Sequence, residues 1–216
     1  MNSMFDGANA LSDENKCVIH TSFSSNANWP YDWSSLCSVT FQPQTTAELQ
    51  TAVDLWVSDN ATALSTYGDI NTWDVSLMTD ISSLFKDKGT FNSDISNWDV
   101  SNVTNMKDLF RQNFIFNQDL SGWDVSSVTN MYQTFSGALI FNQDLSSWDV
   151  SSVTDMQRMF DNAYDFNQDI SSWDVSNVTT MALMFHYAYD FNQDISSWDV
   201  SNVTNLDALF YHAASF

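Results

Sequence analysis

Residues 166–181 read FNQDISSWDVSNVTTM, and close copies of this stretch fill the last two thirds of the chain. The tripeptide Trp-Asp-Val fixes the register of the copies, because it recurs at a constant interval, at Trp73, Trp98, Trp123, Trp148, Trp173 and Trp198. A fixed period of about 20–29 residues is typical of proteins in which each repeat forms one coil and contacts only its neighbours. The repeat therefore predicts a stack of six coils.

The fourth copy shows how one coil is expected to fold. Its residues 156–163 carry apolar side chains at helical spacing, and Thr154 precedes them as a candidate N-cap. Residues 144–150 are rich in apolar and hydroxyl side chains and predict a short strand of a parallel ladder. The apolar residues expected to point into the core are Phe141, Leu145, Trp148, Val150, Val153, Met156, Met159, Phe160 and Ala163.

The predicted fold class is an α/β solenoid. We expect a leucine-rich-repeat-like, right-handed stack of coils with one short parallel β-strand and one short helix per 25-residue repeat, preceded by a small helical cap. Residues 69–216 form this six-coil solenoid, which is expected to be truncated at the C-terminus. Residues 45–68 form the helical N-terminal cap, because Thr45 and Glu48 make a capping box ahead of an amphipathic stripe.

The N-terminal stretch, residues 1–44, departs from the period. Residues 1–8 match residues 156–163, so they are interpreted as the end of a preceding repeat array, followed by an irregular closing segment. This segment contains Cys17 and Cys37, the two cysteines of the chain. In an exported protein they are a candidate disulfide, and the alternative is a pair of buried free thiols.

Residues 166–181, together with the Met-Phe-His-Tyr-Ala stretch at 184–188, resemble the repeats of the BspA-like leucine-rich-repeat surface proteins. That family includes a domain of unknown function from mycoplasma lipoproteins. The resemblance covers residues 69–216 and 1–8, and the first coil departs from it at residues 86–89. It implies an extracellular or cell-surface protein that acts in adhesion or protein binding, and it implies no enzyme activity. The localisation rests on this resemblance, because the fragment contains no signal peptide.

The charge of the chain limits its partners. It has 27 acidic residues, 6 Lys and Arg, and a formal net charge of −21. Binding to nucleic acid requires clustered basic residues, so DNA and RNA are not expected partners. No apolar run is long enough to span a bilayer, so no membrane insertion is expected within this fragment. Proteins or glycans at a cell surface are the expected partners.

Two rows of aspartates run along the expected stack. At a strand spacing of about 4.8 Å, neighbouring carboxylates repel, so each row needs compensation. The first interpretation is that the Asp after each Trp accepts N–H groups from the following turn. The alternative is Ca²⁺ bound between successive coils by Asp oxygens and loop carbonyls, and no other cofactor is expected. The rows are Asp69, Asp94, Asp119, Asp144, Asp169 and Asp194, and Asp74, Asp99, Asp124, Asp149, Asp174 and Asp199.

No catalytic motif is present, and His20, His186 and His212 are too few for a metal cluster, so neither an enzyme nor a metal site is predicted. Binding is instead expected where the copies differ, on the exposed side of the predicted helices. The competing interpretation is that these positions vary without a function. The leading hypothesis is a surface scaffold for adhesion or protein recognition, and the alternatives are a calcium-rigidified structural spacer and a polysaccharide-binding array. The candidate binding residues are Arg111, Tyr132, Arg158, Tyr164, His186, Tyr187, Tyr189, Tyr211 and His212.

Overall fold

A computed structural model of the chain describes residues 11, 16, 19, 23, 26, 31 and 40–216. The chain divides into two compact units, residues 1–40 and residues 41–216. The repeat match of residues 1–8, the Cys17–Cys37 pair and His20 lie outside the described residues. Both helices and all six coils described below belong to the second unit.

Within residues 40–216, two helices precede the coils, α2 (Thr46–Ser58) and α3 (Asn60–Tyr67). The predicted helix start at Thr45 is confirmed, because its side chain accepts a hydrogen bond from the backbone N–H of Glu48. The Glu48 carboxylate in turn accepts the backbone N–H of Gln44 at 2.6 Å. Asp59 separates the two helices, and its side chain caps α3. A short 3-10 turn, η2 (Ile70–Thr72), leads into the first coil.

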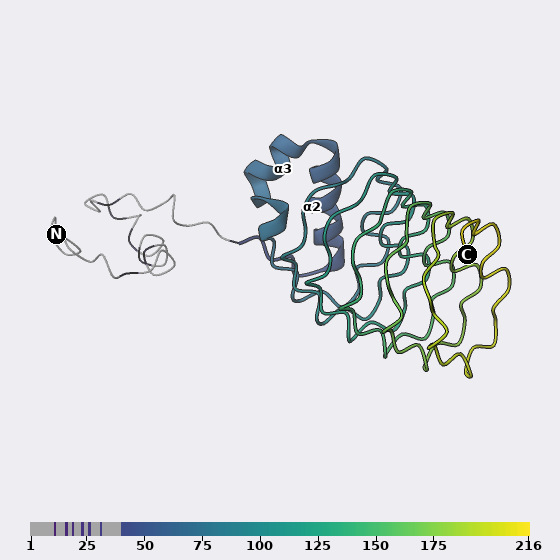
Figure 1. Cartoon of the computed structure of the whole chain (residues 1–216). Helices are drawn as coiled ribbons and strands as arrows, with labels where there is room; N and C mark the ends of the chain where they lie inside the picture. Colours follow the sequence, from purple (N-terminus) through teal and green to yellow (C-terminus); the bar gives the residue numbers. More distant parts are fainter. Residues whose placement is uncertain are drawn as a thin grey trace. The chain divides into compact units, whose positions relative to one another are not determined.

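The predicted α/β solenoid is wrong, because within residues 40–216 the coils contain neither an α-helix nor a strand. Each coil is a series of tight turns, as Figure 1 shows. Parallel pairing is limited to isolated bridges at one position per coil, such as Asp155 with Thr180. Residues 144–150, predicted as a strand, contain a turn closed by the Trp148 N–H and the Leu145 carbonyl.

The predicted helix at residues 156–163 fails for a reason visible in its backbone hydrogen bonds. The N–H groups of Met156, Arg158, Phe160 and Asn162 donate to carbonyls of the next coil. In a helix capped at Thr154, those of Arg158, Phe160 and Asn162 would instead donate to carbonyls four residues earlier. Arg158 and Asn162 also have left-handed backbone conformations, each with φ 58°. The same two positions are left-handed in every coil, and Gly137 occupies one of them. We call residues 156–163 and their equivalents the ladder segment.

The predicted core is confirmed even though the local structure is not. All nine apolar residues expected to face inward in the fourth coil are at most 3% exposed. Phenylalanine rings stack in two columns through the coils, with centroids 5.3–5.8 Å apart in the column that contains Phe135 and Phe160. Each Trp from Trp98 onward also donates its indole N–H to a buried carbonyl of the preceding coil, at 2.8–3.1 Å. Burial of these rings is the main source of stability.

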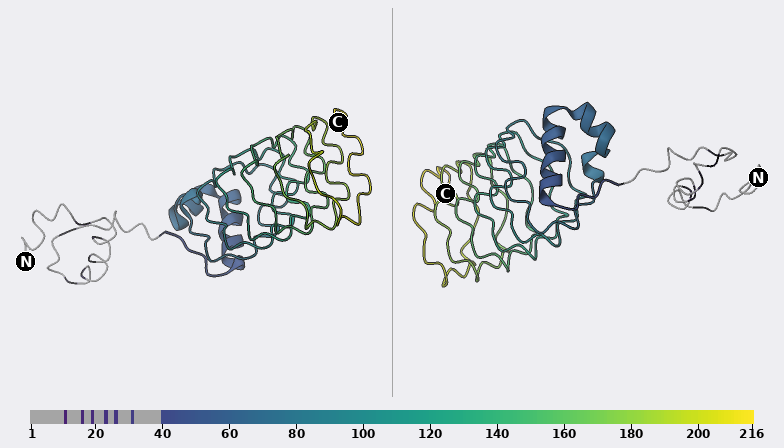
Figure 2. Two further views of the ribbon diagram at one scale, coloured as in Figure 1. Left: turned by 60° about the horizontal axis from the view of Figure 1, so that its bottom comes forward. Right: turned by 180° about the vertical axis from the view of Figure 1, so that it is seen from behind.

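Helix α2 covers the outer side of the first coil, as Figures 1 and 2 show. The side chains of Thr46 and Gln50 donate to the carbonyls of Asp80 and Leu84. In the second coil the equivalent carbonyls accept backbone N–H groups from the first coil. The helix therefore supplies side-chain donors where a preceding coil would supply backbone donors, and it keeps these carbonyls hydrogen-bonded.

Candidate functional site

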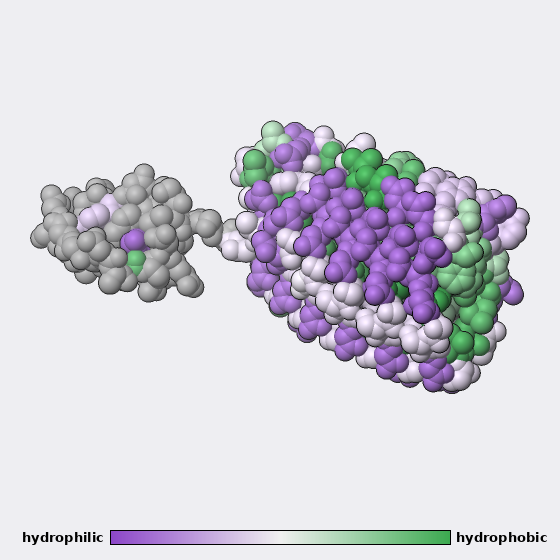
Figure 3. Space-filling model, in the orientation of Figure 1, coloured by the Kyte–Doolittle hydropathy of each residue, from purple (hydrophilic) through white to green (hydrophobic). Residues whose placement is uncertain are grey.

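The two Asp rows are built into turns. Asp124 accepts the backbone N–H of Ser126 at 3.0 Å and its hydroxyl at 2.6 Å, and the other row behaves alike, with Asp144 accepting the N–H of Ser146. The predicted hydrogen bond from the following turn is thus confirmed for the Asp after Trp. Figure 3 shows hydrophilic surface running in bands along the stack.

The predicted N-cap at Thr154 is wrong, and a third row of Asp and Asn side chains accepts the N–H groups at this position instead. Asp155 accepts the N–H of Gln157, and Asn130 accepts the N–H of Tyr132 in the same way. Thr154 instead joins a ladder between coils, in which its N–H donates to the Thr129 carbonyl. The ladder segment therefore begins with an Asx turn and not with a helix cap.

These hydrogen bonds alter the acidity of the carboxyls. The hydroxyl and backbone N–H of Ser126 hold the pKa of Asp124 below its ordinary value. The backbone N–H of Ser146 lowers the pKa of Asp144, and it outweighs the opposing effect of the neighbouring carboxylates of Asp119 and Asp169. Asp155 differs, because its burial raises the pKa. For Asp124 and Asp144, hydrogen bonding therefore has a larger effect on the pKa than repulsion between carboxylates.

Acid should therefore destabilise the coils. A carboxyl whose pKa is lower in the folded chain than in the unfolded chain binds protons more readily when the chain is unfolded. Its contribution to the stability of the fold is therefore present at neutral pH and is lost as the pH falls through the folded pKa. The raised pKa of Asp155 has the opposite effect on stability, but more carboxyls have a lowered pKa than a raised one. We expect the free energy of unfolding, measured with urea, to be nearly constant above about pH 5 and to fall below about pH 4.

Two variants of one residue provide the control for the acid effect. Asp124→Asn keeps an acceptor oxygen without a titrating group, so it should lose less stability on acidification than the unchanged chain. Asp124→Ala removes the acceptor and should lower stability at every pH. An increase in stability on acidification would contradict this assignment, because it would mean that repulsion along the rows dominates.

The variable positions lie in the ladder segment and at the corner that follows it. Every Lys and Arg between residues 41 and 216 also lies in a ladder segment, away from the two Asp rows. The predicted site residues thus occur together with the basic residues. The histidines predicted on a helix surface lie on turns instead, with His186 half-buried and His212 exposed.

An aromatic cluster connects the fourth, fifth and sixth coils. His186 stacks on Tyr211 with centroids 5.5 Å apart, and Tyr187 stacks on His212 at 4.6 Å. Tyr187 also meets Tyr189 edge-on at 5.9 Å. The structure therefore brings six of the predicted residues into one cluster: Tyr164, His186, Tyr187, Tyr189, Tyr211 and His212.

A buried carboxylate, that of Asp161, lies beneath the aromatic cluster and contacts its His186 side chain. Asp161 is 3% exposed and accepts hydrogen bonds from Arg158 at 2.9 Å and Asn162 at 2.7 Å. The Nδ1 atom of His186 lies 2.7 Å from the same carboxylate. This arrangement fixes the positions of Arg158 and His186, because each side chain is held by a charged partner that is shielded from water.

Arg111 and Tyr132 belong to a second group, the basic cluster, in the first three coils. Its centre is the buried carboxylate of Asp108, which lies 3.5 Å from Lys86 and 3.9 Å from Arg111. Lys107 lies over the ring of Tyr132, with its Nζ atom 5.2 Å from the ring centroid. The acidic and basic residues have exchanged places relative to Arg158 and Asp161 of the fourth coil.

A row of exposed apolar residues lies at the corner after the ladder segment. Phe114, Ile115, Ile140 and Tyr189 are each 39–44% exposed. Tyr189 is among the candidate binding residues predicted from the sequence, and Phe114 was expected to extend the same variable face, whereas Ile115 and Ile140 were not predicted. One sequence feature could have predicted this row. At the two positions just before the buried Phe of each repeat, some coils have large apolar residues where other coils have small or polar ones. We call the aromatic cluster, the basic cluster and this row together the recognition face.

The described part of the chain contains no group of three or more His, Cys, Asp or Glu side chains placed to hold a metal ion. Among the helices that the structure describes, none is both long and apolar enough to cross a bilayer. The recognition face offers aromatic, basic and apolar side chains, which are groups that make noncovalent contacts with a partner.

These features define a tandem-repeat protein made of stacked 25-residue coils with a regularly spaced core and a variable face. Residues 51–164 and 141–216 match the family model described as "Mycoplasma protein of unknown function, DUF285". The chain belongs to this family. No curated protein and no solved structure matches the chain.

Proposed function

We propose that this protein is a non-enzymatic scaffold, displayed on a cell surface or secreted, that recognises other proteins through its recognition face. The same function is expected of the BspA-like surface proteins that the repeats resemble. The observation that carries the proposal is the aromatic cluster, in which exposed and half-buried tyrosines and histidines stack on one another and His186 contacts the buried carboxylate of Asp161.

The composition of the face favours a protein partner. Tyr and Arg are enriched at the centres of protein interfaces, where rigid side chains lose little conformational entropy on binding. Tyr211 is 55% exposed and Tyr189 39% exposed, so both can contact a partner without rearrangement of the coils. The neighbouring apolar row, which includes Ile115 and Ile140, would extend the contact with groups that gain from removal from water.

The stacking geometry favours a protein over a polysaccharide. Sugars bind most readily to the open face of an aromatic ring, but Tyr187 and His212 lie nearly parallel, with 13° between their planes, so each covers a face of the other. The edges of these rings remain for hydrogen bonding. The calcium-rigidified spacer has less support, because the Asp rows already accept hydrogen bonds from serines.

The proposal can be tested on a protein array and a glycan array. The unchanged chain should bind array proteins, and the double variant Tyr187→Ala and Tyr211→Ala should weaken this binding about tenfold or more, because central aromatic residues dominate interface energies. Tyr211 is exposed and Tyr187 is half-buried, and neither belongs to the core, so the loss of stability should be small and thermal melting checks it.

The matched control is a double variant in an Asp row, Asp144→Asn and Asp169→Asn, which keeps the acceptor oxygens of both turns. It should bind the same proteins with unchanged affinity. The proposal fails if the tyrosine variant binds normally while the aspartate variant does not. Binding confined to the glycan array would favour the polysaccharide-binding array instead.

A further inference from the structure

The basic residues of the coils gather in one part of the recognition face. Four of the five Lys and Arg between residues 41 and 216 lie in the ladder segments of the first two coils, residues 81–88 and 106–113. These segments contain two Asp, so their formal net charge is +2. Residues 116–216 contain 13 Asp and one Arg, which give a net charge of −12. The first two coils therefore present a positive region on a strongly acidic chain.

Three of these cations keep their hydrogen-bonding groups available for a partner. Lys88 donates to the carboxylate of Asp54 at 2.6 Å, so its charge is already paired. Within residues 40–216, by contrast, the side chains of Lys86, Lys107 and Arg111 donate no hydrogen bond. Lys86 and Arg111 are half-buried and Lys107 is exposed, so a partner can reach all three.

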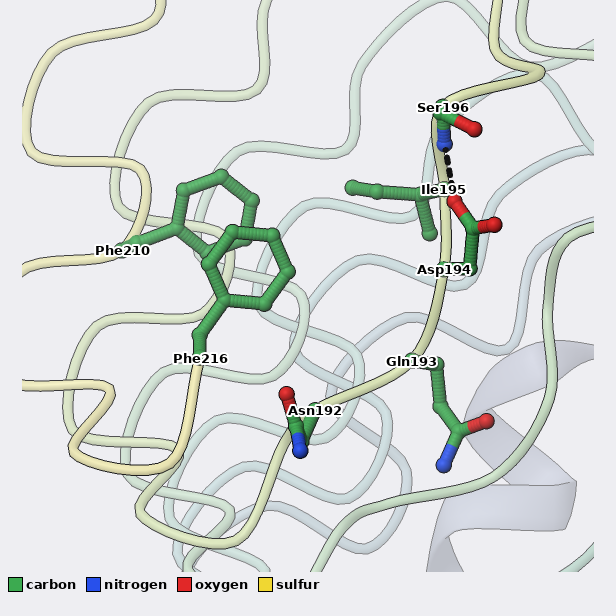
Figure 4. A pocket seen from close by; sticks show the side chains of 7 residues that line it. All are labelled: Asn192, Gln193, Asp194, Ile195, Ser196, Phe210 and Phe216. Atoms are coloured by element: carbon green, nitrogen blue, oxygen red, sulfur yellow. Dashed lines mark hydrogen bonds between the residues drawn. The ribbon is translucent and has the colours of Figure 1, made fainter.

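The carboxylate of Asp108 does not satisfy the cations beside it. It is buried, and it lies 3.5 Å from Lys86 and 3.9 Å from Arg111, which is long for a charge-assisted hydrogen bond. Its Oδ1 atom has no hydrogen-bond partner among the described residues. The carboxylates of the Asp rows differ, because they are bonded to their own turns, as Figure 4 shows for Asp194 and the N–H of Ser196. One loosely held carboxylate between two cations leaves a positive charge, which a second carboxylate would complement.

An apolar strip runs along the stack beside the basic cluster. Phe114, Ile115 and Ile140 follow the ladder segments of the second and third coils and are each 41–44% exposed. The ring of Phe114 lies against Gly89 of the first coil, where a Cβ atom would come within 2.7 Å of it. The glycine thus lets the strip extend over the first coil. In the fourth and fifth coils the equivalents of Ile115 and Ile140 are Asp, so the strip is confined to the same half of the stack as the basic cluster.

The spacing of the coils suits an extended peptide. Equivalent Phe rings of the first three coils lie 5.3 and 5.5 Å apart along the stack. In an extended chain, side chains on one side recur about every 6.6 Å, which is close to this spacing. Alternate side chains also point to opposite sides. A segment running along the stack would therefore direct one set of side chains to the basic cluster and the other set to the apolar strip.

We propose that the first three coils bind an extended acidic segment of a partner protein, in which carboxylates and apolar side chains alternate. The carboxylates pair with Lys86, Lys107 and Arg111, and the apolar side chains pack on Phe114 and Ile115. This inference rests on the proposed function, because it names the chemistry of the partner for one half of the recognition face. An anionic membrane or a nucleic acid fits less well, because its charge would extend beyond the small positive region and be repelled by the Asp rows.

A peptide array tests the chemistry of the partner. Its peptides have either Glu or Gln at alternate positions and either Leu or Ser at the others, and the 216-residue chain is the probe. Glu–Leu peptides should bind better than Gln–Leu and Glu–Ser peptides, although the net charge of −21 opposes the binding of any acidic peptide. Glu–Leu peptides that bind no better than the other two would overturn the inference. Binding to phosphatidylserine vesicles without binding to the peptides would also overturn it.

Removal of charge locates the site. Lys107→Gln and Arg111→Gln together should weaken the binding of Glu–Leu peptides about tenfold or more, because the loss of charged partners across an interface costs affinity. Lys86 remains beside Asp108 in this variant, so the buried carboxylate keeps a counterion, and thermal melting checks the fold. Lys107→Gln alone changes an exposed residue and should already weaken binding. The matched control is Lys88→Gln, which removes the same charge from an already paired residue and should leave the affinity unchanged. Equal effects of the two single variants would contradict the assignment.

The outcomes separate this inference from the proposed function. Array proteins that bind through Tyr187 and Tyr211, together with Glu–Leu peptides that bind no better than Gln–Leu peptides, would overturn this inference and leave the proposed function standing. Glu–Leu peptides that bind through Lys107 and Arg111, together with array proteins that are unaffected by the tyrosine variant, would support this inference and count against the aromatic cluster.

Discussion

Replacing Phe135 by alanine is expected to lower the free energy of unfolding by about 3–5 kcal/mol, the range for a large buried aromatic residue. Phe135 is completely buried and stacks on Phe110, Phe141 and Phe160, with ring centroids 4.1–5.7 Å apart. The substitution opens a cavity where the columns of the second, third and fourth coils meet. Urea unfolding measures the loss.

The position of Phe135 also predicts how the chain unfolds. In a repeat array each coil is stabilised mainly by its neighbours, so a weak third coil separates the coils on either side. We expect the single transition of the unchanged chain to broaden or to split in two. Phe114→Ala is the control, because its ring is 44% exposed and should cost less than about 1 kcal/mol. Equal losses for the two variants would mean that the Phe columns are not the main source of stability.

Proline at position 112 is expected to be about as damaging, with a loss of about 3 kcal/mol or more. Gln112 has φ 57°. Proline cannot adopt this conformation, because its ring locks φ at a negative value. The backbone N–H of Gln112 also donates to the Ser136 carbonyl of the next coil at 2.7 Å, and proline has no such donor. The variant therefore breaks both the left-handed turn and one hydrogen bond of the ladder, and chemical denaturation at neutral pH measures the effect.

Glycine at the same position separates the observed turn from the helix predicted by the sequence. Gln112→Gly should leave stability unchanged or slightly raised, because glycine adopts a left-handed conformation without a steric penalty. The third coil already has Gly137 at the equivalent position, with φ 75°. In a helix interior the same change would cost roughly 0.5–1 kcal/mol. A clear loss of stability in the glycine variant would therefore contradict the turn.

The residues of the candidate site could be chosen from the sequence, but their arrangement could not. Variation between copies identifies His186, Tyr187 and Tyr211, since the positions that must pack are repeated nearly unchanged. Their grouping depends on stacking between coils, which brings equivalent positions of successive repeats into contact. The support from Asp161 was not predicted, because an acidic residue in the ladder segment was expected to be exposed, and it is buried.

The sequence by itself determined the period, the number of coils and the set of apolar residues that recur in the core, because an apolar side chain that recurs once in every repeat stacks on its own copies. It also determined the start of α2, since Thr45 and Glu48 act locally. Only the tertiary structure decided the path of the backbone within a coil. Residues 156–163 have helical spacing, yet alternate N–H groups among them bond to the next coil, so their conformation depends on a partner that is distant along the chain.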